Sequence, residues 1–150
     1  MIDITNEGIY VFDTVSDAVI KKLDCHDSLL GRIVEGSTAN ELVICESGGD
    51  LLLLDTETLE VHRLFNTYDR FHASIAVCSD GAGNLYMMKN NGLDQVQVYN
   101  INERRFVRRF TLPHSGSGTT LEFNKDKSLM LVTTPSCIKV CDVASGQSVA

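Results

Sequence analysis

The stretch that decides the fold of this 150-residue chain is DLLLLDTETLEVHRLF, residues 50–65. A run of four leucines ends at Asp55, a short polar segment follows, and a second, more polar run completes the stretch. A short apolar run bounded by turn residues is typical of a strand that is buried on both faces. Asp55 and Thr56 can hydrogen-bond their own backbone and so form a tight turn. The stretch therefore predicts two strands joined by that turn, the second of them on the outside of the fold.

The same pattern occurs three more times in the chain. It is present in GIYVFDTVSDAVIKKL (residues 8–23), QVQVYNINERRFVRRF (residues 95–110) and CIKVCDVASGQSVA (residues 137–150). The apolar runs close at Asp13, Asp55, Asn100 and Asp142, so the spacings are 42, 45 and 42 residues. Further strand-like segments joined by polar turns precede the closing runs. Four strands in a period of this length are the sequence signature of a propeller blade.

These periods predict an all-β fold: a partial β-propeller of four-stranded antiparallel blades, taken from a propeller of seven or eight blades. We expect one domain over residues 1–150 that holds about three and a half blades. The expected blades are an incomplete one at 1–24, two full ones at 30–66 and 72–112, and a nearly complete one at 118–150. By this count the first blade lacks its innermost strand and the last breaks off within its fourth.

An open stack of blades would leave an apolar face bare at each end. Such a face would plausibly exceed the few hundred Å² of apolar surface that a soluble monomer tolerates. Three explanations stay open at this point. The chain is an excerpt of a longer one, or it pairs with a copy or another chain to close a ring, or it is a partial product that folds poorly.

The pattern resembles the WD-repeat propellers, whose blades carry a Ser-x-Asp-Gly hairpin and close an inner strand with an aromatic residue and an aspartate. Ser79-Asp80-Gly81 stands in a hairpin of this kind, and Phe12-Asp13 and Tyr99-Asn100 stand where Trp-Asp would. The turn at residues 11–14 is also similar to quinoprotein-like and surface-layer propeller repeats. The chain has no tryptophan, so the hydrogen-bonded network of the WD-repeat family cannot be complete in any blade.

Composition and charge limit the classes of partner. The net charge is −7, and an acidic chain repels phosphate backbones, so we do not expect nucleic acid as a general partner. No apolar run approaches the length that spans a bilayer, and the N-terminus lacks the features of a signal peptide. Five cysteines without a repeated spacing, and no Asn-x-Ser/Thr sequon, favour a reducing compartment. We therefore expect an intracellular, cytoplasmic protein.

A search of the sequence for catalytic or metal-binding groups finds no convincing candidate. Residues 26–28 hold the His, Asp and Ser of a hydrolase triad, but adjacent residues on an extended segment point apart. On a strand, Cys137 and Cys141 would lie roughly 13 Å apart, too far for one zinc ion, so we expect buried free thiols. His72 and His114 precede innermost strands, where the WD-repeat resemblance implies a structural histidine. We expect no catalytic site, no cofactor and no metal, and a chain that is not an enzyme.

The loop at residues 66–72 has the composition of a contact surface. Its polar and aromatic members include types, tyrosine and arginine, that are enriched at interface hot spots. Loops between blades emerge on the rims of a propeller, where a partner can reach them. We therefore predict partner binding by Tyr68, Asp69, Arg70 and His72.

A basic segment, residues 104–110, is the most distinctive polar feature. On a regular strand, alternation would place Phe106 on the same face as Arg104 and Arg108. Arginines interleaved with aromatics can bind nucleic acid or an acidic peptide. They can equally protect an outer edge strand from aggregation, and the matching Lys21-Lys22 favours this second role. The possible basic edge consists of Arg104, Arg105, Arg108 and Arg109.

For function, these features favour a non-catalytic protein–protein interaction scaffold that presents the rim loops of a WD-repeat-like propeller. Its partners would be other proteins or the missing blades of its own propeller, and oligomers could form through exposed blade faces. Two alternatives stay open. The chain could be a fragment of an enzymatic or ligand-sensing propeller, or a regulatory propeller domain of a larger multidomain protein.

Overall fold

The computed structural model describes residues 1–5, 8–23, 32–45, 51–65, 75–89, 95–112, 120–134 and 137–149. These residues contain no helix, and the all-β prediction is confirmed. Short apolar runs separated by polar turns therefore form strands throughout this part of the chain. The strands are β1 (Ile2–Thr5), β2 (Gly8–Phe12), β3 (Val19–Leu23), β4 (Arg32–Glu35), β5 (Glu41–Cys45), β6 (Leu51–Asp55), β7 (Val61–Phe65), β8 (Ile75–Ser79), β9 (Asn84–Lys89), β10 (Gln95–Asn100), β11 (Arg105–Thr111), β12 (Thr120–Phe123), β13 (Leu129–Thr133) and β14 (Ile138–Asp142).

The strands of the described residues form four antiparallel sheets. The first sheet is β1–β2–β3, the second β4–β5–β6–β7, the third β8–β9–β10–β11 and the fourth β12–β13–β14. Every strand pairs only with its neighbours in sequence. The quoted apolar runs are β2, β6, β10 and β14, one in each sheet. The four-stranded antiparallel unit predicted from the repeat is therefore confirmed in the second and third sheets.

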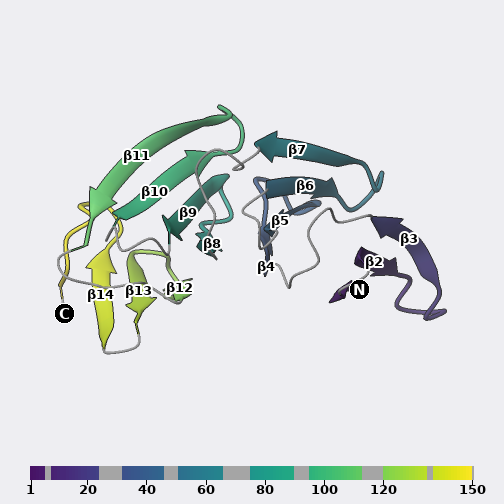
Figure 1. Cartoon of the computed structure of the whole chain (residues 1–150), viewed down its shortest axis with the longest axis horizontal. Helices are drawn as coiled ribbons and strands as arrows, with labels where there is room; N and C mark the ends of the chain where they lie inside the picture. The colour runs from purple at the N-terminus through teal and green to yellow at the C-terminus, as the bar shows by residue number, and fades with distance from the viewer. Residues whose placement is uncertain are drawn as a thin grey trace.

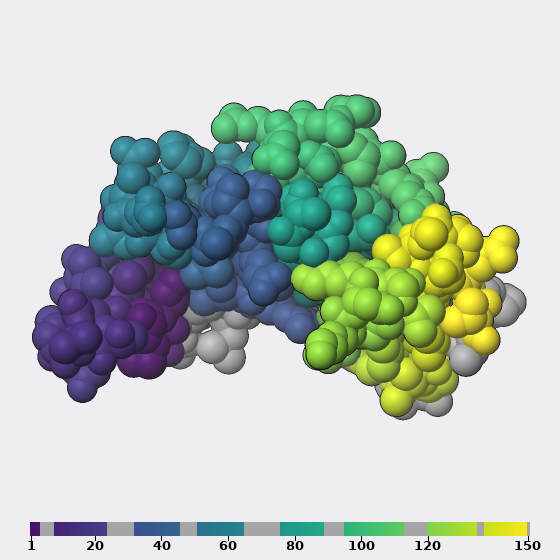
Figure 2. All heavy atoms as spheres, turned by 180° about the vertical axis from the view of Figure 1, so that it is seen from behind, coloured from purple at the N-terminus to yellow at the C-terminus, as the bar shows by residue number. Residues whose placement is uncertain are grey.

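The four sheets follow one another in sequence order along an arc (Figure 1). β7 and β11 run along the convex side, and β4, β8 and β12 lie toward the concave side (Figure 1). The first and fourth sheets are at opposite ends of the arc, and the surface is hollowed between them (Figure 2). This is a partial propeller-like fold, in which the first strands of the second, third and fourth sheets are innermost.

Apolar side chains fill the spaces between successive sheets. We call the face that a sheet turns toward the next sheet its forward face, and the opposite face its rear face. Since side chains alternate along a strand, each strand contributes every second residue to each face. The core between the second and third sheets consists of Val43, Cys45 and Leu51 of the second sheet and Val77, Leu85, Met87 and Tyr99 of the third. The core between the third and fourth sheets consists of Tyr86, Met88, Val96 and Val98 of the third sheet and Leu121, Met130, Val132 and Cys141 of the fourth.

A side-chain oxygen closes the turn after each apolar run. Asp55 Oδ1 accepts hydrogen bonds from the backbone N–H groups of Glu57 and Thr58, each at 2.8 Å. These bonds, that from Thr58 foremost, hold the pKa of the Asp55 carboxyl below its usual 3.8. The predicted turn mechanism is confirmed, and it is repeated by the equivalent side chains Asp13, Asn100 and Asp142.

We expect protonation of these turn carboxylates to destabilise the fold in acid. At Asp142, the hydroxyl and then the N–H of Ser145 lower the pKa of the carboxyl from 3.8. Because the folded pKa lies below the unfolded one, the stabilisation is complete above about pH 4 and is lost as the pH falls through the folded value. Urea unfolding at pH values from 7 to 3 measures this loss.

The variant Asp142→Asn tests the cause of the acid sensitivity. Asparagine keeps the Oδ1 acceptor, as Asn100 does in the third sheet, but cannot be protonated in this range. We expect it to fold and to lose less stability between pH 5 and pH 3 than the unmodified chain. Asp17→Asn is the control, since no hydrogen bond to the Asp17 carboxylate is present among the described residues. An equal acid loss in both variants would count against the turn as its source.

Candidate binding surface on the inner strands

The inner strands bring together charged side chains that are far apart in the sequence. Arg32 lies at the start of β4, in the second sheet, and Glu122 lies on β12, in the fourth. Their guanidinium and carboxylate groups are 3.6 Å apart. The pair therefore joins two sheets that are not neighbours in sequence, across the inner strand β8 of the third sheet.

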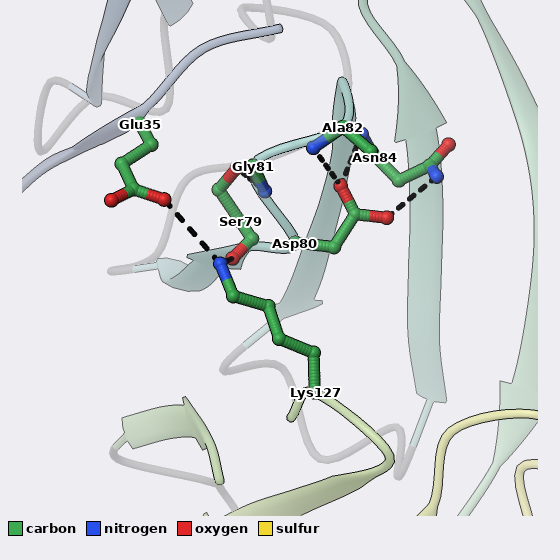
Figure 3. A network of polar contacts seen from close by, with 7 residues as sticks. All are labelled: Glu35, Ser79, Asp80, Gly81, Ala82, Asn84 and Lys127. Atoms are coloured by element: carbon green, nitrogen blue, oxygen red, sulfur yellow. Dashed lines mark hydrogen bonds and ion pairs between the residues drawn. The ribbon is translucent and has the colours of Figure 1, made fainter. Parts of the chain in front are cut away.

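Lys127 forms a second link, and it involves all three sheets (Figure 3). Its Nζ lies 3.3 Å from Oε2 of Glu35, at the end of β4, and donates to the backbone carbonyl of Ser79, at the end of β8, at 3.4 Å. Lys127 itself stands in the turn between β12 and β13, with a left-handed φ of 60°. A single ammonium group thus contacts the ends of inner strands from two sheets while belonging to a third.

The turn that carries Ser79 is held by its own hydrogen bonds (Figure 3). Asp80 Oδ1 accepts from the N–H groups of Ala82 and Asn84, at 2.8 and 3.0 Å. The side-chain amide of Asn84 donates to Asp80 Oδ2 at 2.7 Å. The side-chain oxygen of Asn84 accepts a hydrogen bond from Asn100 Nδ2 at 2.8 Å, so the hairpin between β8 and β9 is tied to the end of β10. These bonds fix the position of the carbonyl that Lys127 contacts.

The charged groups line a shallow hollow of about 340 Å³ between β4, β8 and β12. Arg32 and Lys127 are 41% and 36% exposed, and Glu122 and Glu35 are 65% and 71% exposed. Exposed ion pairs of this kind contribute only about 0–1 kcal/mol to stability. The pairs are therefore open to exchange with a partner's charges at little cost. The rest of the lining is Val34, Cys78, Ser79, Leu121, Phe123, Asn124 and Lys125.

The chemistry of this hollow is that of a binding surface. Its one thiol, Cys78, is buried, and burial raises the pKa of that thiol to about 12. A protonated, buried thiol is a poor nucleophile. The hollow instead presents guanidinium, ammonium and carboxylate groups on a framework of sheets. Groups of these kinds suit the binding of polar or charged partners.

A second hollow of about 600 Å³ lies between the first and second sheets. Its lining is mainly apolar, with Thr56 and Glu57 as the polar members. Hollows of this size and composition are typical of small-molecule sites. The apolar lining residues include Ile2, Val11, Ile33, Leu42, Leu54 and Leu59.

The loop predicted to bind a partner, with Tyr68, Asp69, Arg70 and His72, lies outside the described residues. It follows β7 and precedes β8 in the sequence, and β8 is one of the three inner strands. His26 and His114 also lie outside the described residues. The predicted contact role of the loop therefore stays a prediction.

The basic segment is arranged differently from the sequence prediction. Arg104 stands in the turn before β11, with a φ of 51°, and not on the strand. A β-bulge makes Val98 pair with Arg108 and Tyr99 with Phe106, so Val107 is an extra residue. Alternation is broken there, and Phe106 packs against Tyr99 at 5.3 Å on the rear side. The prediction that Phe106 shares a face with Arg104 and Arg108 is therefore wrong.

The four arginines of this segment have separate environments. Arg108 donates to the backbone carbonyls of Val143 and Ala144, at 2.7 and 2.6 Å, and so ties the third sheet to the fourth. Arg105 pairs with Glu103 at 2.5 Å. Arg104 and Arg109 are exposed. Arg108 is thus committed to an internal contact, while the other three face solvent on the outer strand and its turn.

The cysteines differ in burial. Cys45, Cys78 and Cys141 are buried free thiols, and burial raises the pKa of Cys45 to about 12. Cys137 is exposed, so the prediction that it is buried is wrong: it stands just before β14 begins, in the turn where its N–H donates to Thr134 Oγ1 at 3.0 Å. Among the described residues, no group of three or more His, Cys, Asp or Glu side chains could hold a metal ion.

The sequence prediction missed the inner-strand residues Arg32, Glu35, Glu122 and Lys127. One signal was present: in the second blade the strand expected to be innermost, Arg32–Glu35, carries a charge on each side of a short apolar run. Charged residues on a strand that should line a channel mark that channel as polar. The sequence contained no indication of which cation meets which carboxylate, because up to 92 residues separate the partners.

Comparisons with known proteins support the fold alone. No protein-family model matches the sequence, and no curated protein matches it. Among chains of known structure, 772 match, so the architecture by itself singles out no activity. One is hydrazine synthase of Kuenenia stuttgartiensis, with a TM-score of 0.60 and 17% sequence identity over 78% of this chain and 33% of that chain. The chain thus spans about a third of the length of that structure.

One further finding concerns membranes. Nowhere in the described part of the chain is there a helix with the length and hydropathy of a membrane span.

Proposed function

We propose that this chain is a non-catalytic protein–protein interaction scaffold of the WD-repeat-like kind. In this proposal the inner strands present a charged surface to another protein, and residues of the loop at 66–72 also contact that protein. The observation that carries the proposal is the group Arg32, Glu35, Glu122 and Lys127, which the second and fourth sheets bring together across the inner strand of the third while leaving each side chain a third or more exposed.

The arrangement favours binding for a physical reason. Arg32 and Lys127 are partly exposed and paired only weakly with carboxylates across the inner strands, so a partner's carboxylates can replace these pairs at little cost. The framework beneath them is a set of hydrogen-bonded sheets. Fixed charges of both signs then select a partner with the complementary arrangement, and they raise the rate of association.

The setting that we propose is the cytoplasm. Cys45, Cys78, Cys137 and Cys141 are free thiols, which suits a reducing compartment. With a net charge of −7, the chain is more suited to protein partners than to nucleic acid.

Charge reversal on the inner strands tests the proposal. We expect Arg32→Glu with Lys127→Glu to reduce the recovery of bound proteins about tenfold or more, since one close charge pair across an interface contributes about 1.5 kcal/mol or more. The measurement is affinity purification from the source cells with quantitative mass spectrometry. A second variant, Tyr68→Ala with Arg70→Ala, tests the predicted loop in the same way.

The matched control makes the same change in charge on the outer strand. Arg105→Glu with Arg109→Glu reverses two exposed charges far from the inner strands, and we expect it to keep the partners. Circular dichroism checks that all three variants keep the β structure. If the inner-strand variant and the outer-strand control bind the same proteins in the same amounts, the proposal is wrong.

A ligand-sensing propeller is the second candidate, and the apolar hollow between the first and second sheets favours it. Filling that hollow with Ile33→Trp would abolish saturable binding of an apolar small molecule, whereas reversal of Arg32 and Lys127 would leave it unchanged. The scaffold proposal predicts the opposite pattern for protein partners, so the two candidates are separable with the same set of variants.

A further inference from the structure

The three cores between successive sheets differ in the side chains that fill them. The core between the second and third sheets contains Tyr99, and the core between the third and fourth contains Tyr86, whose ring meets that of Phe123 edge-on at 5.0 Å. Among the described residues, the core between the first and second sheets has aliphatic members alone. The hollow of about 600 Å³ lies at this same interface. The interface whose core lacks an aromatic ring is therefore the one that is incompletely filled.

The repeat shows which side chains leave the space. Leu54 of the second sheet stands where the third sheet has Tyr99, directly before the closing Asp or Asn. Thr56 stands where the third sheet has Ile101, and the backbone N–H of each donates to an equivalent carbonyl at 2.8 Å. Tyr99 and Ile101 are 3% and 4% exposed, whereas Thr56 is exposed. With the same backbone arrangement, the second sheet thus presents a smaller and a more polar side chain at these two positions.

The lining of the hollow suits an aromatic ring that carries a positive charge. Ile2, Leu42 and Leu54 supply apolar wall, and Phe12 supplies a ring on which another ring can pack. Glu57 is the one charged residue among the described residues that line the hollow. In the described part of the chain, no cation lies within ion-pair distance of the Glu57 carboxylate. An apolar wall with one unpaired carboxylate beside it fits a ligand with an apolar ring and a cationic group.

The ammonium groups beside the hollow already have acceptors. Lys21 Nζ donates to the backbone carbonyl of Leu59, and the amine of Met1 donates to that of Phe12 at 2.9 Å. The carboxylate of Glu57 has no such engagement with a described residue, and the residue is exposed. With a net charge of −7, the chain as a whole also attracts cations more than anions. These observations favour a cationic ligand over an anionic one.

We propose that the hollow between the first and second sheets binds a small molecule that has an aromatic ring and a positively charged amino group. The ring enters the apolar part, a place that aromatic side chains fill at the other two interfaces, and the amino group faces Glu57. Burial of the ring supplies most of the affinity, and the exposed ion pair adds up to about fivefold. The inference does not rest on the scaffold proposal, and it names a ligand class for the ligand-sensing alternative.

Indole compounds test this proposal. The chain has no tryptophan, so the fluorescence of an added indole ring can be excited apart from that of the protein's tyrosines. Tryptamine has the ring and an amino group, and indole-3-propionate has the same ring with a carboxylate. We expect saturable binding of tryptamine, about fivefold or more tighter than that of indole-3-propionate.

Two substitutions of Glu57 test the ion pair. Glu57→Gln should lower the affinity for tryptamine about fivefold, and Glu57→Lys should reverse the order of the two compounds. The control is Glu60→Gln, the same change at an exposed glutamate that does not line the hollow. We expect it to leave both affinities unchanged.

Side chains borrowed from the third sheet test the location. Leu54→Tyr with Thr56→Ile places in the second sheet the residues that the third sheet has at the equivalent positions, so we expect the hollow to close and both compounds to lose binding. Circular dichroism and urea unfolding check that the β structure remains. Arg32→Glu with Lys127→Glu changes only the inner strands and should leave the binding of tryptamine as it is.

The proposal is overturned if tryptamine does not bind saturably, or if both compounds bind equally well to the unmodified chain. It is also overturned if the filled variant keeps its β structure and still binds tryptamine. Should the filled variant fail to fold, the substitutions of Glu57 decide, because they change only an exposed side chain. No protein partner enters these assays, so their failure leaves the scaffold proposal standing, and loss of the scaffold proposal leaves these results standing.

Discussion

Replacement of Leu121 by alanine is expected to lower the free energy of unfolding by about 2–5 kcal/mol. Leu121 is fully buried on the rear face of β12, in the core that joins the third and fourth sheets. Truncation removes apolar contacts and leaves a cavity that hydrogen-bonded sheets on both sides cannot easily close. Since whole domains are stable by only about 5–15 kcal/mol, this is a large part of the total.

The adjacent residue provides the control for this prediction. Glu122→Ala changes the next side chain, which points to the opposite face of β12, is 65% exposed and pairs with Arg32. We expect it to cost about 0–1 kcal/mol. Urea unfolding measures both variants, and a shift of the midpoint at constant slope identifies a change in stability. Equal losses for the two variants would show that Leu121 does not join the sheets as described.

Gly36→Ala is expected to have the second largest effect, a loss of about 1–3 kcal/mol from overpacking. Gly36 is buried directly after β4, and its N–H donates to the carbonyl of Glu41 at 2.8 Å. A methyl group at this position would contact Glu41 Cβ and would lie 2.9 Å from the Glu41 carbonyl oxygen. These atoms belong to the backbone and its first side-chain carbon, so relief requires movement of the hairpin itself.

The same substitution should also disturb the inner strands. Glu35 immediately precedes Gly36, and its carboxylate pairs with Lys127. A displaced hairpin moves that carboxylate, so we expect weaker partner binding in addition to lower stability. Thr38→Ala is the control, because Thr38 lies in the same hairpin with its side chain exposed. Urea unfolding and partner recovery are measured together. If the two variants behave alike in both assays, the steric argument at Gly36 is wrong.

Some of the candidate surface could be anticipated from the sequence, and some could not. The hairpin turn at residues 79–81 was recognisable from its residue types, and it does carry a carbonyl that Lys127 contacts. The meeting of Arg32 with Glu122 was not recognisable, because strand alternation tells which face a residue is on but not which sheet lies opposite. The basic segment shows a second limit. The pattern of arginines and aromatics contains no sign of the extra residue at Val107, yet that one residue changes the face of everything before it.

The sequence by itself determined the strands, their order and the turns between them. These depend on local physics: short apolar runs form buried strands, and a carboxylate or amide after each run, as at Asp55 and Asn100, accepts hydrogen bonds from its own turn. Pairing between sequential strands follows from short connections.

Only the tertiary structure decided which charges meet on the inner strands and which arginine ties one sheet to the next. Those features depend on the curvature of the arc and on single bulges, which place residues such as Glu35 and Lys127 in contact across 92 positions of sequence. The curvature is the sum of small angles between successive sheets, and the side chains packed between the sheets determine those angles. The local pattern of residues along the sequence does not reveal them.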